Sequence, residues 1–272
     1  MDKAEILRRF EQEVRTRSQT APGFAVAWDG PVLRMVGPDR EAQSNGILAS
    51  RLDEASADAA IARQVAFFRE QGRAFEWKLF DYDRPADLAK RLAAAGFVAA
   101  EPETLVVCEV GADTRYREPP PGILIEKIDD PAGFGVIEEV NGAVYGDPDH
   151  ARWLAATVAS EKRADPDALS LYAAFADGEP VSVAWMRHRR GEAFGTLWGG
   201  STLEAWRGRG LYQALVASRV AEARSRGCRW LTVDCSPMSL PILVRCGFEA
   251  LAITTPYIRS PGRFTAGTAR VV

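Results

Sequence analysis

Residues 207–212 have the residue types that bind a diphosphate. They read Arg207-Gly208-Arg209-Gly210-Leu211-Tyr212, and they lie between an apolar run at 194–203 and the sequence Gln213-Ala214-Leu215-Val216. This pattern predicts a strand, a loop and then a helix. The two glycines let the main chain approach a ligand without a Cβ in the way, and the first turn of a helix presents unpaired N–H groups at its positive end. We therefore expect the backbone of this loop to hold a pyrophosphate.

The composition limits which other chemistries this chain can perform. It has 272 residues and a formal net charge of -3, which gives no general reason to bind nucleic acid. None of the four cysteines forms a CxxC pair, and the two histidines, His150 and His188, lie far apart in sequence. We expect no metal site and no disulfide framework.

No run of about 18 apolar residues is present to span a bilayer. The first residues, Met1-Asp2-Lys3-Ala4-Glu5, are charged and lack the apolar core of a signal peptide. The sequence therefore predicts a cytoplasmic protein that does not bind membranes.

Two segments about 150 residues apart repeat the same order of residues. The first contains Trp77, Asp81, Pro85, Leu88, Leu92 and Gly96-Phe97, and the second contains Trp230, Asp234, Pro237, Leu240, Leu243 and Gly247-Phe248. Each predicts a buried strand ending near an Asp, a helix that starts at a proline, and a Gly-Phe that leads into another strand. The repetition favours a tandem duplication. The first copy has Asp53 and Glu54 where the second has its glycine loop, so we do not expect it to bind a diphosphate.

The length and the repeat favour two domains, at 1–115 and 121–260, joined by a proline-rich linker at 115–122. The second domain begins with a strand at 123–125, followed by helices at about 131–145 and 152–163 and a polar loop at 146–150 between them. Strands at 169–176 and 180–188 then form a hairpin around Asp177-Gly178. The predicted fold class is α/β (α+β), with a mixed, mostly antiparallel sheet flanked by helices in each domain.

Residues 123–258 resemble the GNAT acetyltransferase family in this order of elements. The family signature is Arg or Gln, two variable residues, Gly, one variable residue, and Gly or Ala. Arg207 and Gly210 match it, whereas Tyr212 departs from the last position and reshapes the start of the helix. Some members of the family are tandem proteins with one degenerate half. The chain resembles these tandem members, and the N-terminal copy is expected to be the degenerate half.

The resemblance implies that acetyl-CoA is the co-substrate and that no metal is needed. The main chain at Thr202 and Leu203 would hold the pantetheine arm. The residues implied to bind the diphosphate and the rest of the cofactor are Arg207, Gly208, Arg209, Gly210, Leu211, Tyr212 and Ser236. The pair Gly199-Gly200 predicts a bulge in the preceding strand, and the alternative is that these glycines make room for Trp198 or Trp206.

The residues that usually transfer protons in this family are missing. The place of the general base is Thr196, which leaves Glu192 and Glu204 as candidates or as solvated carboxylates at the strand ends. The place of the tyrosine that protonates the thiol is Leu243. Ser239 lies one helical turn earlier and could act instead, or could cap the helix.

Asp234 and Cys235 end a strand that the resemblance places beside the acceptor. Asp234 is a candidate catalytic residue there, and we expect Cys235 to be a packed thiol. Tyr145, Trp185 and Trp198 would line the acceptor site. Asp147 and Asp149 in the nearby loop would suit a cationic amine, or would be a solvated turn.

These features predict an N-acetyltransferase that transfers an acetyl group to a primary amine of a small molecule or a peptide by direct attack in a ternary complex. The alternative is a non-catalytic sensor or interaction module that binds acyl-CoA. An ATP site is disfavoured because the loop lacks the Lys-Ser/Thr of a P-loop. The acceptor and the oligomeric state stay open, a homodimer included.

Overall fold

The structure, a computed structural model, describes residues 2–17, 21–111 and 118–261. The chain divides into two compact units that are not successive stretches of sequence. The N-terminal unit comprises Met1–Leu105, Asp234–Pro237 and Leu251–Val272, and the C-terminal unit comprises Val106–Val233 and Met238–Ala250. The linker predicted at 115–122 lies partly outside the described residues, and residues 118–122 lead directly into a strand.

Within the described residues, the N-terminal unit has three α-helices and a mostly antiparallel sheet. The helices are α1 (Lys3–Phe10), which continues into a π-helical turn at Glu11–Arg15, α2 (Ala57–Glu70) and α3 (Leu88–Ala94). The strands that begin in this unit are β1 (Ala25–Asp29), β2 (Val32–Val36), β3 (Asn45–Ser50), β4 (Phe75–Phe80), β5 (Val98–Ala99) and β6 (Glu103–Glu109), and a 3-10 turn lies at Ala42–Ser44.

The C-terminal unit alternates helices and strands. Its described helices are α4 (Gly135–Tyr145), α5 (Pro148–Ala164), α6 (Leu211–Ser225) and α7 (Leu240–Arg245), with 3-10 turns at Pro131–Phe134 and Glu204–Trp206. The strands are β7 (Ile123–Ile128), β8 (Leu169–Ala176), β9 (Glu179–His188), β10 (Phe194–Thr202), β11 (Trp230–Cys235) and the start of β12 (Glu249–Arg259).

Both units contain a strand, a helix and a parallel strand in this order. In the N-terminal unit, β3 precedes α2 in sequence and β4 follows it, and these two strands pair parallel. The strands β1, β2 and β3 pair antiparallel. In the C-terminal unit, β10 pairs parallel with β11 on either side of α6, and β7 to β10 are antiparallel. The predicted fold class is therefore confirmed.

The last strand of the chain belongs to the N-terminal unit. Residues 254–259 of β12 pair antiparallel with β4, from Thr254 opposite Phe80 to Arg259 opposite Phe75. Conversely, the end of β6 lies beside β11 in the C-terminal unit, where the Thr232 hydroxyl donates a hydrogen bond to the Val106 carbonyl at 2.8 Å. This exchange is why the two units are interleaved in sequence.

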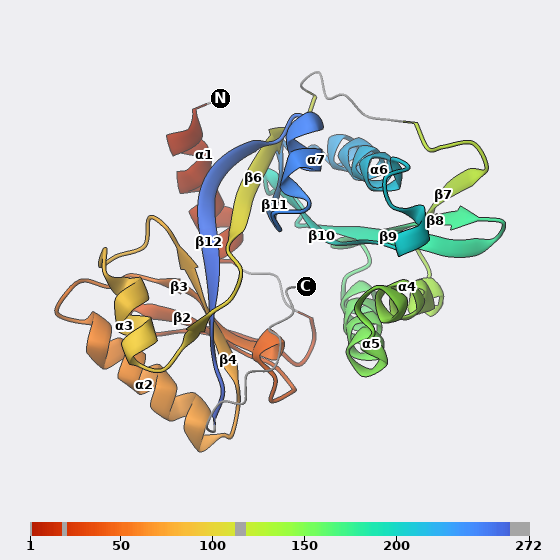
Figure 1. Cartoon of the computed structure of the whole chain (residues 1–272). Helices are drawn as coiled ribbons and strands as arrows, with labels where there is room; N and C mark the ends of the chain where they lie inside the picture. The colour runs from red at the N-terminus through yellow and green to blue at the C-terminus, as the bar shows by residue number, and fades with distance from the viewer. Residues whose placement is uncertain (1, 18–20, 112–117, 262–272) are drawn as a thin grey trace. The chain divides into compact units, whose positions relative to one another are not determined.

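Helices cover both faces of the C-terminal sheet (Figure 1). α4 and α5 lie against one face and α6 against the other. The core under α4 and α5 includes Val158, Leu171 and Trp185, whereas Leu215 of α6 packs on Tyr172 and Ala184. Alternate residues of β8 and β9 thus enter different cores, as the two-residue period of a strand requires.

Most of the predicted elements of the C-terminal unit are present. The hairpin turns at Asp177 and Gly178, with φ of 51° and 86°. The loop expected at 146–150 is shorter than predicted, because α5 already starts at Pro148, where Asp147 caps it by accepting a hydrogen bond from the His150 N–H at 3.0 Å. None of the helices within the described ranges is long and apolar enough to cross a membrane.

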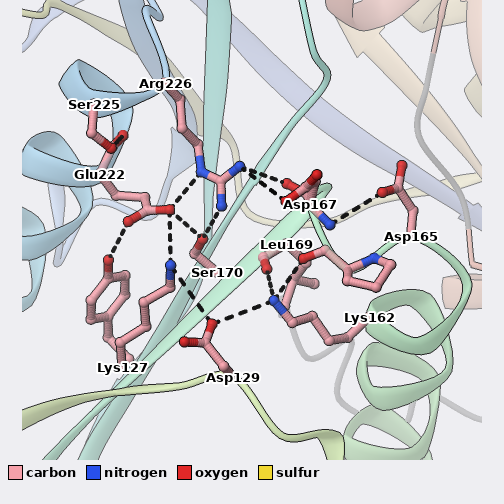
Figure 2. Close-up of polar contacts among 12 residues, drawn as sticks. Lys127, Asp129, Lys162, Asp165, Asp167, Leu169, Ser170, Glu222, Ser225 and Arg226 are labelled. Carbon is pink, nitrogen blue, oxygen red and sulfur yellow. Dashed lines mark hydrogen bonds and ion pairs between the residues drawn. The ribbon is translucent and has the colours of Figure 1, made fainter.

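A polar network fastens the C-terminal half of α6 to the sheet (Figure 2). The Glu222 carboxylate accepts hydrogen bonds from Lys127 at 3.1 Å, from Ser170 at 2.9 Å and from Tyr172 at 3.0 Å, and it pairs with Arg226. Although burial opposes it, these donors lower the pKa of Glu222 to about 2. The network sets the position of α6, whose other end carries the glycine loop.

We predict that Glu222→Gln lowers the free energy of unfolding at pH 7 by about 2 kcal/mol, because the donors lose a charged partner. The native carboxylate is stabilising above its unfolded pKa, and this contribution is lost as the pH falls towards 2. The gap between wild type and variant in urea unfolding should therefore narrow from pH 7 to pH 3. The exposed Glu179→Gln is the matched control, and an equal change in both variants would contradict the prediction.

Candidate functional site

A bulge in β10 creates the centre of the candidate site. The register between β9 and β10 shifts between Trp198 and Ser201, as the paired glycines predict. A Cβ on Gly199 would lie 1.8 Å from the ring of Trp185, and a Cβ on Gly200 would lie 2.5 Å from the ring of Tyr212. The glycines thus make room for two aromatic rings, but not for Trp198 or Trp206.

The parallel pairing of β10 with β11 stops just before this bulge. The last paired residues are Thr196 and Thr232, although β10 continues to Thr202. Beyond these two residues, the backbone N–H and C=O groups on the adjoining edges of β10 and β11 no longer pair with each other. An extended polar chain could pair with them there.

The glycine loop leads directly into α6. Gly208 and Gly210 have φ of 73° and 90°, and Gly210 is the N-cap of the helix without a capping side chain. The first hydrogen bond into α6 runs from the Ala214 N–H to the Gly210 carbonyl at 3.0 Å, so the preceding N–H groups belong to the turn that a helix leaves unpaired. A Cβ on Gly208 would meet no atom within 4 Å. The loop therefore has the backbone shape and the space that an anion needs.

Side chains hold the loop without filling it. The exposed Arg207 donates from Nε to the Thr202 carbonyl at 3.2 Å, and the Arg209 guanidinium lies 4.6 Å from the centre of the Trp206 ring. The buried Leu211 anchors the start of α6 against β8 and β9. Both arginines thus add positive charge beside the helix N-terminus.

Part of the main chain expected to hold the pantetheine arm is already hydrogen-bonded. The Leu203 N–H donates to the Val181 carbonyl at 3.0 Å, and the Thr202 carbonyl accepts from Arg207. The Thr202 hydroxyl lies 2.7 Å from that of Ser182. A ligand at this point would share or replace these contacts.

Tyr212, the departure from the expected signature, turns towards the sheet. Its ring lies against Gly200, and its side chain hydrogen-bonds to Arg219, two turns further along α6. Arg219 is 1% exposed; it donates to the Leu215 carbonyl at 3.0 Å and to the Trp185 carbonyl at 3.4 Å. Sequence reasoning missed this arginine. The available signal was its spacing from Leu211 and Leu215, which places a charged residue on the buried stripe of the helix.

The corresponding helix start in the N-terminal unit has a carboxylate beside it. The Ser56 N–H and hydroxyl both donate to Asp53 Oδ1, at 2.8 and 2.6 Å. These bonds lower the pKa of the Asp53 carboxyl. A carboxylate therefore lies directly before α2, whereas α6 is preceded by the glycine loop.

Of the three residues considered for the base, only Glu204 lies beside the loop: it is exposed and starts the 3-10 turn Glu204–Trp206. The Thr196 hydroxyl accepts a hydrogen bond from Trp198 Nε1 at 2.8 Å. Glu192 lies in the turn before β10, with its carboxylate 3.8 Å from Arg189. The nine residues of β10 separate it from the loop by about 30 Å.

The expected acid positions lie at α7. Leu243 is fully buried in the core, and Ser239 is the N-cap residue of α7, where its side chain makes no capping hydrogen bond. The backbone carbonyl of Ser239 accepts from the Leu243 N–H at 3.0 Å. The structure thus places Ser239 at the start of α7.

Asp234 lies in a charged cluster of the N-terminal unit, together with Lys78 of β4 and Glu103 of β6. Asp234 pairs directly with Lys78, and Lys78 Nζ lies 3.8 Å from Glu103. Burial raises the pKa of Glu103 to about 7, although Lys78 opposes the shift. Ser236 also belongs to this unit. Burial raises the pKa of the neighbouring Cys235 thiol to about 11, as expected for a packed cysteine.

The three residues expected to line the acceptor site lie on the face covered by α4 and α5. Trp185 and Trp198 are opposite each other on β9 and β10, but Trp185 is buried in the core and Trp198 is 42% exposed. The Arg187 guanidinium lies 4.6 Å from the Trp198 ring and is held by the buried Glu161 at 2.9 Å. Of the two tryptophans, Trp198 is therefore the one that a ligand can reach.

Tyr145 contacts the bulge from the end of α4. The Ser201 hydroxyl donates to Asn141 Oδ1 at 3.0 Å and lies 3.4 Å from the Tyr145 hydroxyl. This polar contact ties α4 to the strand segment that follows Gly199–Gly200. Among the described residues, no group of three or more His, Cys, Asp or Glu side chains is placed to hold a metal ion.

The acetyltransferase (GNAT) family model matches residues 136–248. This stretch runs from α4 to the end of α7 and includes the bulge, the glycine loop and α6. None of the curated proteins matches the sequence.

Solved structures with GNAT names align with nearly the whole chain. A GCN5-related N-acetyltransferase from Kribbella flavida is 18% identical with a TM-score of 0.69, over 96% of this chain and 95% of that one. A tandem GNAT protein from the clavulanic acid biosynthesis pathway is 13% identical with a TM-score of 0.64, over 95% and 88%. A GCN5-related N-acetyltransferase from Sphaerobacter thermophilus is 15% identical with a TM-score of 0.61, over 95% and 85%. These similarities establish the fold.

We predict that Gly199→Ala lowers the free energy of unfolding by about 2–4 kcal/mol, because its Cβ would overlap the buried Trp185 ring. Gly208→Ala is the matched control: its φ of 73° is close to the 61° of Gly199, but its Cβ meets no atom within 4 Å. Urea unfolding of both variants separates the overlap from backbone strain. Equal losses would show that the ring contact contributes nothing.

We also predict that Glu103 makes stability fall with rising pH. The folded state keeps the Glu103 proton from the unfolded pKa near 4.5 up to about 7, so its contribution is lost as the pH rises through that window, by at most about 3 kcal/mol. Glu103→Gln should therefore unfold at higher urea than wild type at pH 8, with a smaller gain at pH 5. The exposed Glu101→Gln is the control. A gain of Glu103→Gln that is the same at both pH values would disprove the prediction.

Proposed function

We propose, from the GNAT domain that residues 136–248 of this chain form, that the protein is an acetyl-CoA-dependent N-acetyltransferase. The acceptor is a primary amine of a small molecule or a peptide. The observation that carries the proposal is the glycine loop at 207–212. Gly208 and Gly210 have positive φ, and the loop leads into the N-terminus of α6 after the strand β10, whose pairing with β11 has ended.

The loop supports acetyl-CoA as the donor. Its backbone N–H groups and the positive end of α6 suit the diphosphate of coenzyme A, and the exposed Arg207 and Arg209 add charge. The pantetheine arm would then run along β10, beyond Thr196, where the ladder to β11 has ended. This path leads the thioester to the bulge at Gly199–Gly200.

The acceptor amine would approach from the face covered by α4 and α5. The exposed Trp198 on this face offers an apolar surface for the acceptor, and Tyr145 borders the bulge. The neutral amine attacks the thioester carbonyl carbon, the carbon–sulfur bond breaks, and the amine nitrogen gives up a proton. Holding both reactants in line supplies a large part of the rate enhancement, which suits a site where Thr196 stands in the place of a basic residue.

The N-terminal unit would serve a supporting role in this proposal. In this unit Asp53 bonds to Ser56, the residue directly before α2, and a carboxylate there would repel a phosphate group of the kind that the loop of the C-terminal unit would bind. We assign acetyl-CoA binding to the C-terminal unit and regard the N-terminal unit as a degenerate copy of it.

We predict that Gly208→Glu weakens acetyl-CoA binding at least 100-fold in titration calorimetry, because its carboxylate would lie among the N–H groups that hold the diphosphate. The control is Gly178→Glu in the β8–β9 turn, whose φ of 86° and open surroundings resemble those of Gly208. It should bind acetyl-CoA as wild type does. Equal affinity in the two variants would refute this binding site.

Release of coenzyme A thiol from acetyl-CoA, measured against a panel of primary amines, tests the reaction itself. Amine-dependent turnover by wild type, lost in Gly208→Glu, is the expected result. Tight acetyl-CoA binding without turnover on any amine would instead favour the non-catalytic sensor.

A further inference from the structure

Among the described residues of the C-terminal unit, no carboxylate forms an ion pair with the buried cation of Arg219. Arg219 is 1% exposed, and it donates to two main-chain carbonyls and hydrogen-bonds to Tyr212. Its Nη2 has no hydrogen-bond partner among the described residues. Burial lowers the pKa of Arg219, and the titratable groups that oppose this shift are Tyr212 on its own helix, Tyr172 on β8 and Cys246 after α7.

A buried, unbalanced guanidinium is costly. Leaving a charge without water or a counter-charge costs several kcal/mol, and an arginine does not relieve this cost by losing its proton. A leucine or methionine of similar volume would pack at this position of α6 without that cost. The arrangement is understandable if negative charge develops beside Arg219 during the reaction.

The hydroxyl that Arg219 holds belongs to Tyr212, which connects the glycine loop with the bulge. Tyr212 is the second residue of α6, directly after the loop, and its ring packs on Gly200. The ladder between β10 and β11 has already ended at this level of the strand. If acetyl-CoA lies as proposed above, its sulfur reaches the segment of β10 that the Tyr212 ring covers.

We propose that Tyr212 is the proton donor to the coenzyme A thiolate. Arg219 is the positioning residue that hydrogen-bonds to the Tyr212 hydroxyl and stabilises its deprotonated form. This inference rests on the proposed function. It assigns to α6 the proton transfer for which the expected position in α7 holds the buried Leu243.

The step balances as follows. The amine nitrogen attacks the carbonyl carbon, and the collapse of the tetrahedral intermediate breaks the carbon–sulfur bond, whose electron pair goes to sulfur. The Tyr212 O–H gives its proton to that sulfur, which leaves as the free thiol. The tyrosinate is stabilised by Arg219 until it takes back a proton from water, which receives the one that the amine releases. The products are the amide and coenzyme A thiol.

Tyr212→Phe tests the donor, because it keeps the ring on Gly200 and removes the hydroxyl. We expect kcat for thiol release to fall about 100-fold, which is within the range for a lost general acid. The dissociation constant of acetyl-CoA should stay within about twofold of the wild-type value, and the melting temperature should stay within about 2 °C of it. Tyr257→Phe in the N-terminal unit removes a tyrosine hydroxyl elsewhere and should keep kcat unchanged.

A double-mutant cycle tests Arg219. Arg219→Lys should lower kcat about tenfold in the wild-type background and leave it unchanged in Tyr212→Phe, since a residue that acts through the Tyr212 hydroxyl has no effect once that hydroxyl is gone. A purely structural role would lower kcat equally in both backgrounds.

The outcomes separate this inference from the proposed function. A Tyr212→Phe variant whose kcat stays within threefold of wild type overturns the inference and leaves the acetyltransferase standing. An equal effect of Arg219→Lys in both backgrounds overturns the role of Arg219. A wild-type protein that binds acetyl-CoA but turns over no amine overturns both the reaction and the inference.

Discussion

The close packing of two aromatic rings on opposite sides of Gly199–Gly200 is the constraint on which the rest of the C-terminal unit depends. Trp185 and Tyr212 lie so near these residues that neither position can accept a Cβ without movement. The rings hold β10 in its bulge, and the bulge shifts its register with β9. Because β10 also leaves its ladder with β11 at Thr196, the strand opens at one place while its ends stay fixed.

Helix α6 links this opening to both ends of the unit. Its N-terminus continues the glycine loop, its middle carries Arg219 to the Trp185 carbonyl, and its C-terminal half is held by the Glu222 network. Arg219 lies about two turns after the helix start and Glu222 less than one turn after Arg219, so a shift of the helix would disturb all three contacts together. A polar network far from the bulge thereby positions the groups that we assign to chemistry.

The two units show how one local layout can give two helix starts with different properties. Both place a helix between parallel strands, but α2 follows Asp53, whose carboxylate bonds to the N-cap residue Ser56, whereas α6 follows the glycine loop and starts at Gly210. A carboxylate close to a helix start is itself stabilised there and disfavours a second anion at the same place. The uncapped start of α6 forgoes that stabilisation and keeps its N–H groups for a ligand.

The sequence by itself determined the features that depend on neighbouring residues: the glycine loop, the bulge, the hairpin at Asp177-Gly178 and the helices beside them, because spacing and glycine conformation act over a few residues. Tertiary structure alone decided which side chains meet. Asp234 pairs with Lys78, 156 residues away in sequence. The reason is that residues 234–237 belong to the N-terminal unit, although the residues before them belong to the C-terminal unit. Thr196 is engaged by Trp198, and Arg219 is buried beside Tyr212. The residue type determines the charge and the hydrogen-bonding capacity of a side chain. Its burial and its partners depend on strands that are distant in sequence, and burial and partners determine what each group can do.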